Sequence, residues 1–506
     1  MMRHRRIWQV LLLLAALLPG AARADGAPSV RIGKQILLGV GEADGVASFR
    51  GIAYAQPPVG PLRWKAPQPL GYPAGTVDAT EFAPACPQGD GNTRWYRRLA
   101  KAMGADPAVV PPISRLSEDC LYLNIWTPQP RVGARLPVMV WIHGGSNENG
   151  YAYEPNYRGG PLAREGVVIV TIAYRLGLLG FFAHPSLGSE RDGAGAGGRQ
   201  GLLDQIAALR WIRAHIAAFG GDPANVTVSG ESAGGTDIAL LAAMPQVRGL
   251  FARAIIESGY LAPDGVTSLP AARNFAARLF SPAITAEQLR ALHWQEIVAL
   301  QDRKLRGHFY TPVAPVPHRS QVPLLIGSNA NEYRMYLPAD EVGLHAALAK
   351  ELRGLPLYRR RAVRRWTAQL GGDLASKVDA VSSGKAFHCP AARMAAATAA
   401  GGQTVHLYRF MRVRPGAHNL GAYHGAEIPY VFGTADDWLP ASAQDAALAQ
   451  QIQQYWLNFA RTGRPEAAGL PRWPRSTSRT LAVLPIGGAA ASDTSAKTAL
   501  CRLLRP

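Results

Sequence analysis

One pentapeptide restricts the fold of this 506-residue chain more than any other feature: Gly-Glu-Ser-Ala-Gly at positions 230–234. Val-Thr-Val-Ser at 226–229 precedes it, and a helix-forming run at 236–244 follows. In a tight strand–turn–helix connection the central serine is strained and its hydroxyl is exposed, and the flanking glycines relieve the crowding. The context therefore favours Ser232 as a nucleophile over an incidental serine in a glycine-rich turn.

Two backbone segments are suited to binding a negative charge that develops near this serine. The N–H of Ala233 lies at the start of the predicted helix, where the helix dipole favours an oxyanion. His-Gly-Gly-Ser at 143–146 follows a continuous apolar run at 136–142, which is typical of a strand buried on both faces. Loops of this type direct N–H groups at the same oxygen, so the two segments predict an oxyanion hole.

Buried strands alternate with helices along the chain, which predicts an α/β fold with a large, mainly parallel sheet and helices on both faces. Two helical blocks interrupt this order and are predicted to form a lid over the site. The predicted strands are 136–142, 167–174, 226–231, 251–258, 323–327 and 405–410; the predicted helices are 200–219 and 444–462, and the two blocks are 270–305 and 340–400.

The first 24 residues have the pattern of a secretory signal peptide. A basic start at 1–6 leads into an apolar run at 7–18, and Ala-Arg-Ala at 22–24 is a cleavage site. Residues 25–506 are then expected to form one domain in the periplasm or outside the cell. No later run is long and apolar enough to span a bilayer, so no stable membrane insertion is expected.

The charge and the cysteines narrow the function classes. The net charge is +19, and the four arginines of the signal segment account for four of these charges. The basic residues are interpreted as scattered, without a dense run that interleaves aromatic residues, which argues against nucleic-acid binding. Attraction of anionic substrates stays open. The four cysteines lack Cys-x-x-Cys spacing, so two disulfides are expected and neither a metal nor a redox pair.

Two segments near the N-terminus are predicted to lack helices. The proline-rich stretch at 57–64 is interpreted as an extended path over the surface. The residues between the first two cysteines, 87–119, are interpreted as a polar, arginine-bearing loop.

A serine nucleophile needs a histidine to accept its proton and a carboxylate to orient that histidine, in the chain order Ser, acid, His for this type of sheet. The acid should follow a strand end, which favours Glu332 after the strand at 323–327 over Asp340, Glu341 and Glu351. Five histidines follow Glu332: His345, His388, His406, His418 and His424. Position in a loop after a late strand selects His418 and His424 and does not choose between them.

From about Ile32 to the C-terminus, the chain resembles the type-B carboxylesterase/cholinesterase family of α/β-hydrolases. The resemblance rests on Ser-Glu-Asp-Cys-Leu-Tyr-Leu-Asn at 117–124, Tyr-Arg-Leu-Gly at 174–177, Asp-Gln at 204–205 and Phe-Gly-Gly-Asp-Pro at 219–223, together with Phe-Arg-Gly-Ile-Ala-Tyr-Ala at 49–55 and Pro-Pro-Val-Gly at 57–60.

This resemblance assigns roles that the residues alone left open. Gly-x-Asn-x-x-Glu at 327–332 implies Glu332 as the acid, and His-Gly-x-Glu at 424–427 implies His424 as the base. It also implies disulfides Cys86–Cys120 and Cys389–Cys501, and a structural ion pair between Arg63 and Glu118.

Two departures from the family pattern bear on specificity. Ser146 replaces the third glycine of the oxyanion loop, so the donors are expected to be the N–H groups of Gly145, Ser146 and Ala233. Val110 and Met335 stand where choline-binding members place aromatic residues. Because a quaternary ammonium group is poorly bound without an aromatic cage, this argues against cholinesterase activity.

The sequence thus predicts an exported serine carboxylesterase acting on small-molecule esters, without cofactor or metal, as a monomer or weak homo-oligomer. A non-catalytic binding protein on the same fold is the alternative of another class. An esterase specialised for acidic esters is a narrower variant, suggested only by the charge.

Overall fold

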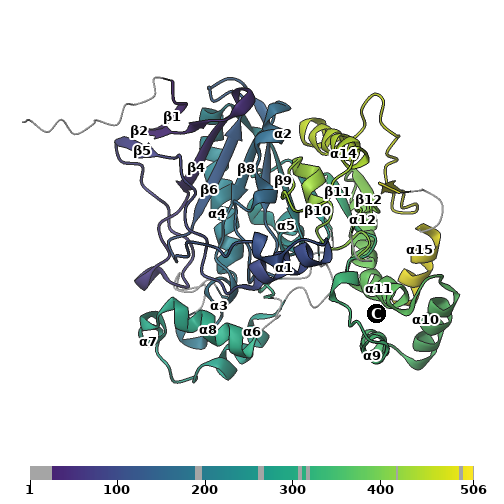
Figure 1. Ribbon diagram of the computed structural model, residues 1–506. Helices are drawn as coiled ribbons and strands as arrows, with labels where there is room; N and C mark the ends of the chain where they lie inside the picture. The colour runs from purple at the N-terminus through teal and green to yellow at the C-terminus, as the bar shows by residue number, and fades with distance from the viewer. Residues whose placement is uncertain are drawn as a thin grey trace, which may run out of the picture.

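The computed structural model describes residues 26–188, 197–259, 267–305, 310–314, 319–416, 420–488 and 494–504 (Figure 1). The expected signal segment and His418 lie outside these residues. Among the described residues, no helix has the length and apolar character needed to cross a bilayer.

A ten-stranded sheet forms the centre of the molecule, in the order β13-β12-β11-β10-β9-β7-β8-β6-β4-β3. The strands from β13 to β8 are parallel, and β6, β4 and β3 complete the sheet in antiparallel pairs. The bounds are β3 Val40–Gly41, β4 Ala47–Ala53, β6 Tyr122–Thr127, β7 Leu136–Ile142, β8 Val168–Ile172, β9 Gly221–Glu231, β10 Arg253–Glu257, β11 Leu324–Asn329, β12 Val405–Phe410 and β13 Val483–Ile486. A small separate sheet contains β1 Ser29–Ile32, β2 Gln35–Leu38 and β5 Gly75–Asp78.

Both faces of the large sheet are buried, because alternate side chains of a strand point to opposite faces. On β7, Val138, Val140 and Ile142 belong to one hydrophobic core, whereas Met139 and Trp141 belong to the other. The first core is covered by α4 Gln200–His215, α5 Ala233–Ala243 and α12 Cys389–Ala400; the second is covered by α2 Gly160–Arg164, α13 Ile428–Phe432 and α14 Ala443–Thr462. The predicted mainly parallel sheet with helices on both faces is therefore confirmed.

The two predicted helical blocks are each divided into several helices. The first contains α6 Leu269–Leu279, α7 Ala286–Ala291 and α8 Trp294–Lys304; the second contains α9 Glu341–Leu352, α10 Leu357–Gln369 and α11 Leu374–Ser383, followed by a π-helical turn and α12. In Figure 1 the first block and helices α9–α11 project from the lower part of the molecule, on either side of α1. The remaining helices are α1 Gly91–Ala102, the short α3 Gly177–Gly180 and α15 Thr494–Leu503.

Two expectations about the N-terminal part need correction. The stretch 57–64 lies on the surface only in part: residues 59–61 are exposed, but Trp64 is fully buried and its indole N–H donates to the carbonyl oxygen of Leu178. The segment between Cys86 and Cys120 contains α1, which buries Tyr96 and Leu99 three residues apart on one face. That helical spacing was visible in the sequence but was outweighed by the polar and proline residues around it.

Three covalent or ionic links hold these peripheral segments. Cys86 is joined to Cys120, and Cys389 to Cys501, in the pairing that the resemblance implied. Arg63 and Glu118 form a bidentate, largely buried ion pair, with Nε and Oε1 2.6 Å apart. The same guanidinium donates to the carbonyl oxygens of Arg290 and Leu292, so it also anchors the first helical block.

Candidate active site

Ser232 occupies the sharp turn between β9 and α5. Its φ is 57° and its ψ is −121°, a combination that costs a non-glycine residue free energy. The turn packs so closely on β7 that a Cβ atom at Gly230 or Gly234 would collide with the carbonyl oxygen of Ile142. The two glycines are therefore required by the close approach of neighbouring backbone, as the pentapeptide predicted.

His424 and Glu332 meet Ser232 at this turn. The Nε2 atom of His424 lies 2.8 Å from Oγ of Ser232, and its Nδ1 lies 2.6 Å from Oε2 of Glu332. Glu332 follows β11 and is fully buried, and its second oxygen accepts the N–H of Asn329 at 2.6 Å. The structure thus brings the three predicted residues into one hydrogen-bonded chain.

The other candidate acids and bases lie elsewhere. Asp340 caps the N-terminus of α9 by accepting the N–H of Gly343, and Glu351 pairs with Lys385. Glu341 and His345 face each other on the exposed side of α9. Of the remaining histidines, His388 contacts the carbonyl oxygen of Asn329, and His406 is buried beside Trp473.

The loop that carries His424 is held by residues next to the acid. The side-chain amide of Asn329 donates to the carbonyl oxygen of Tyr423 at 2.7 Å and also to Glu427. Asn331 exchanges two hydrogen bonds with Ala422, through its own N–H and its side-chain oxygen. These contacts join the acid and base loops into one unit, and single-sequence reasoning missed both asparagines because their partners lie about 90 residues away.

A second carboxylate, that of Glu231, also faces His424. Oε1 of Glu231 lies 3.2 Å from Nε2 of His424, and both side chains are nearly buried. Burial opposes protonation of His424, but Glu231 and Glu332 outweigh this effect and raise the pKa of His424 to about 9. Burial raises the pKa of Glu231, and the neighbouring imidazole works against that rise. The sequence contained Glu231 inside the pentapeptide, yet nothing in the pattern indicated this contact.

The predicted oxyanion loop has two consecutive residues in the left-handed backbone region. Gly145 and Ser146 have φ values of 94° and 60°, and both line the cavity in front of Ser232. Among the described residues, the N–H groups of Gly145 and Ser146 donate to no backbone oxygen in the loops and turns. The N–H of Ala233 is the first of α5 and has no intrahelical acceptor. The N–H groups of all three predicted donors are thus without a backbone acceptor of this kind.

The next residue, Asn147, anchors this loop to neighbouring segments of the chain. It is fully buried, and its side-chain amide donates to the carbonyl oxygen of Tyr310 at 3.1 Å and to Asp237 at 3.2 Å. Its oxygen accepts the hydroxyl of Tyr174 at 3.2 Å. A loop anchored in this way keeps its N–H groups oriented before substrate arrives.

The cavity in front of Ser232 has a volume of about 610 Å³. Trp95 and Tyr336 stand in its wall, with the indole N–H donating to the phenol oxygen at 3.0 Å. These aromatic residues are at positions that the sequence did not single out. Val110 packs against Tyr96 instead of facing the cavity, while Met335 is buried in the second core.

The whole chain is strongly basic, but the side chains that line this cavity are not predominantly basic. Its lining includes four acidic side chains, Glu148, Glu154, Glu231 and Asp302, and two basic ones, Arg94 and Arg98. Burial, with a contribution from Asp302, raises the pKa of Glu148 to about 7. The wall therefore offers no concentration of positive charge to an anionic substrate.

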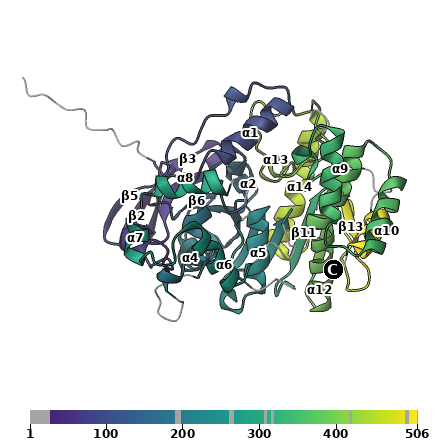
Figure 2. The same ribbon diagram turned by 90° about the horizontal axis from the view of Figure 1, so that it is seen from below.

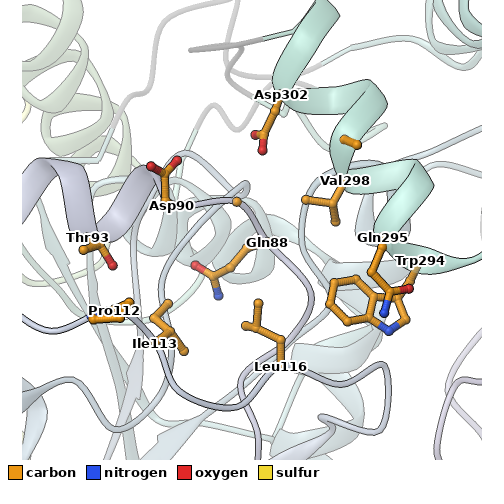
Figure 3. Close-up of a pocket in the computed structure, with 12 residues that line it drawn as sticks. Gln88, Asp90, Thr93, Pro112, Ile113, Leu116, Trp294, Gln295, Val298 and Asp302 are labelled. Carbon is orange, nitrogen blue, oxygen red and sulfur yellow. The ribbon is translucent and has the colours of Figure 1, made fainter.

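A second cavity of about 370 Å³ adjoins the first, and Asp302 lines both (Figure 3). Figure 3 shows Trp294, Val298 and Asp302 of α8 facing the segment that follows Cys86. Gln88 in that segment is held by a pair of 2.8 Å hydrogen bonds with the backbone of Gly150. The two cavities thus share one carboxylate in their walls, that of Asp302.

No site for a metal is found within the described ranges, where no group of three or more His, Cys, Asp or Glu side chains could hold an ion.

The chain matches the statistical profile of the carboxylesterase family over residues 32–503. It is 33% identical to the fumonisin B1 esterase of Sphingopyxis macrogoltabida, over 92% of this chain and 88% of that protein. It is 37% identical to the para-nitrobenzyl esterase of Bacillus subtilis (strain 168), over 87% and 91%. The solved carboxylesterase Est55 of Geobacillus stearothermophilus superposes with a TM-score of 0.77 at 30% identity, covering 93% of this chain and 99% of that one. The chain belongs to the carboxylesterase family, with the α/β-hydrolase fold, and is a carboxylic ester hydrolase.

Proposed function

We propose that the protein is an exported serine carboxylesterase that works through an acyl-enzyme, with Ser232 as nucleophile, His424 as base and Glu332 as the orienting acid. The observation that carries this proposal is the hydrogen-bonded chain Oγ–Nε2–Nδ1–Oε2, with distances of 2.8 and 2.6 Å. A nucleophile, a base and an orienting carboxylate within hydrogen-bond distance are the geometric requirement for this chemistry.

In the first half-reaction, Oγ of Ser232 attacks the ester carbonyl while Nε2 of His424 takes its proton. Glu332 stabilises the resulting imidazolium through Nδ1. The N–H groups of Gly145, Ser146 and Ala233 bind the negative oxygen of the tetrahedral intermediate. His424 then protonates the departing alcohol, and the acyl group stays on Ser232.

In the second half-reaction, a water molecule gives its proton to His424 and attacks the acyl-enzyme. The same N–H groups bind the second tetrahedral oxyanion. Collapse of this intermediate returns the proton to Oγ of Ser232 and releases the carboxylic acid. Each cycle therefore uses His424 once as base and once as acid in each half.

The substrate class follows from the cavity. Neutral esters suit its wall better than acidic ones, because carboxyl groups outnumber guanidinium groups there. Trp95 and Tyr336 offer ring faces to an apolar group. The second cavity, on the other side of Asp302, offers further room for a long alcohol or acyl arm.

Export and domain organisation are part of the same proposal. The signal pattern at 1–24 and two disulfides, which persist in oxidising compartments, support export. Strands from residue 40 to residue 486 share one sheet, which supports a single catalytic domain over 25–506.

The test is covalent labelling. A fluorophosphonate should modify the purified protein once, and peptide mapping should place the adduct on Ser232, with loss of activity in proportion to labelling. A non-catalytic binding protein would neither be labelled at Ser232 nor hydrolyse p-nitrophenyl esters. A preference for an anionic ester over its neutral isostere would contradict the substrate class.

A further inference from the structure

Helix α10 presents a basic and apolar face to solvent. Leu357 and Tyr358 at its start are 69% and 65% exposed, values that are unusual for large apolar side chains. Arg361, Arg364 and Arg365 are also exposed. At 100° per residue these five side chains lie within about 120° of arc, so they form one face. We call these five residues the α10 face.

The opposite side of α10 is firmly seated. Val363 is fully buried in a small core with Leu352, Val381 and Leu500, and Trp366 packs against that core. Figures 1 and 2 both place α10 at the edge of the molecule, and Figure 1 shows it outside α11. The α10 face is therefore a rigid outer surface.

The charge of this helix is one-sided. α10 contains five arginines and no acidic residue. Among the described residues, no carboxylate forms an ion pair with Arg361, Arg364 or Arg365. Like charges three and four positions apart destabilise a helix, so the spacing works against folding of α10 itself. The description of the basic residues as scattered was wrong for this segment, where arginines adjoin Tyr358 and Trp366.

We propose that the α10 face docks the protein peripherally on an anionic phospholipid surface. Arginine guanidinium groups pair with lipid phosphates, and the proximity of several such groups makes their contributions add. Leu357 and Tyr358 supply apolar groups that enter the headgroup boundary, as in helices that lie in the membrane interface. Arg359 lies 5.7 Å from the centre of the Tyr358 ring and donates to its hydroxyl, which orients this aromatic side chain.

A polyanion such as nucleic acid fits the face less well. It would neutralise the arginines but leave Leu357 without an apolar environment, whereas a lipid surface satisfies both parts of the face. This surface is independent of the ester-hydrolysing site, because none of its five residues lines the cavity at Ser232.

The test uses the mature full-length protein and flotation with vesicles. Equal parts of phosphatidylglycerol and phosphatidylcholine should carry the protein at low salt, pure phosphatidylcholine should not, and binding should fall steeply as NaCl is added. R361Q with R364Q and R365Q should weaken partitioning about 100-fold, since each arginine near an anionic surface contributes about fivefold. Hydrolysis of a soluble p-nitrophenyl ester should be unchanged in the triple variant, which shows that it is folded.

The matched control removes the same charge elsewhere, with R472Q, R475Q and R479Q on the exposed segment before β13. This control variant should keep most of the vesicle binding. If both triple variants lose vesicle binding equally, the net charge of the protein and not the α10 face determines binding, and the proposal is overturned. L357S with Y358S should weaken vesicle binding and leave any binding of duplex DNA unchanged. Absence of binding to the anionic vesicles, or DNA binding through the three arginines without vesicle binding, would also overturn it.

Discussion

The carboxylate of Glu231 lies 3.2 Å from Nε2 of His424, the same ring nitrogen that contacts Oγ of Ser232. The residue directly before the proposed nucleophile therefore influences the electrostatic environment of the proposed base. Glu231 is 5% exposed and His424 is 9% exposed, so water screens this contact poorly. The proximity of Glu231 stabilises the imidazolium and reduces the fraction of His424 that is ready to accept a proton near neutral pH.

The pH dependence of the reaction tests this relationship. We expect kcat/KM to rise with pH as His424 loses its proton, because only the neutral imidazole acts as the base. Glu231→Gln removes a negative charge beside the ring, lowers the pKa of His424 and should move the rising limb to lower pH. Asp302→Asn, which also lines the cavity, is the control and should leave the limb in place. If wild type and Glu231→Gln show the same rise of kcat/KM with pH, Glu231 does not influence the pKa of His424.

The nucleophile is tested by Ser232→Ala. This variant should lose at least about three orders of magnitude in kcat, because the hydroxyl that forms the acyl-enzyme is gone. Circular dichroism should show an unchanged fold, because alanine keeps the Cβ atom of serine and loses only the hydroxyl. Residual turnover near the wild-type rate would exclude the serine mechanism.

The base and its orienting acid are tested together. His424→Ala should lower kcat by roughly three or more orders of magnitude, since the three residues act as a unit. Glu332→Gln should impair kcat less strongly, because the geometry is kept while the charge that stabilises the imidazolium is lost. His418→Ala is the comparison variant and should stay within a few-fold of wild type. An inactive His418→Ala with an active His424→Ala would reverse the assignment.

The disulfide between α12 and the C-terminal helix predicts a stability change. It closes a loop with a sequence separation of 112 residues, and loss of such a link typically costs about 2–4 kcal/mol. Cys389→Ser with Cys501→Ser should therefore unfold at lower denaturant, while kcat on a small ester stays near wild type. Peptide mapping without reduction should also find Cys86 linked to Cys120. Free thiols at these two positions in exported material would contradict the pairing.

The buried ion pair gives a second stability prediction. Arg63→Met leaves Glu118 without its partner and removes the donors to the carbonyls of Arg290 and Leu292, so it should cost about 3–5 kcal/mol. Arg63→Met with Glu118→Leu should cost less, because no buried charge is left alone. Chemical denaturation of both variants provides the measurement; a double variant as unstable as the single one would show that the lost carbonyl contacts, not the charge, dominate.

The sequence by itself determined the strand–turn–helix connection around Ser232 and the alternation of strands and helices. These features depend on local physics. Only glycine fits at 230 and 234, and continuous apolar runs such as 136–142 are stable only when both faces of a strand are buried. The choice of His424 over His418 needed the family resemblance. Both histidines belong to one loop, and their positions in the sequence do not predict which side chain lies near the distant Ser232.

Only the tertiary structure decided what surrounds these groups. Glu231 faces His424, Asn329 and Asn331 hold the histidine loop, and Trp95 and Tyr336 form the cavity wall, because each contact joins segments that are far apart in sequence or on different elements. Side-chain identity does not encode such neighbours. They arise when the parallel strands bring their ends to one edge of the sheet, and the free energy of each contact then depends on the burial that this packing creates.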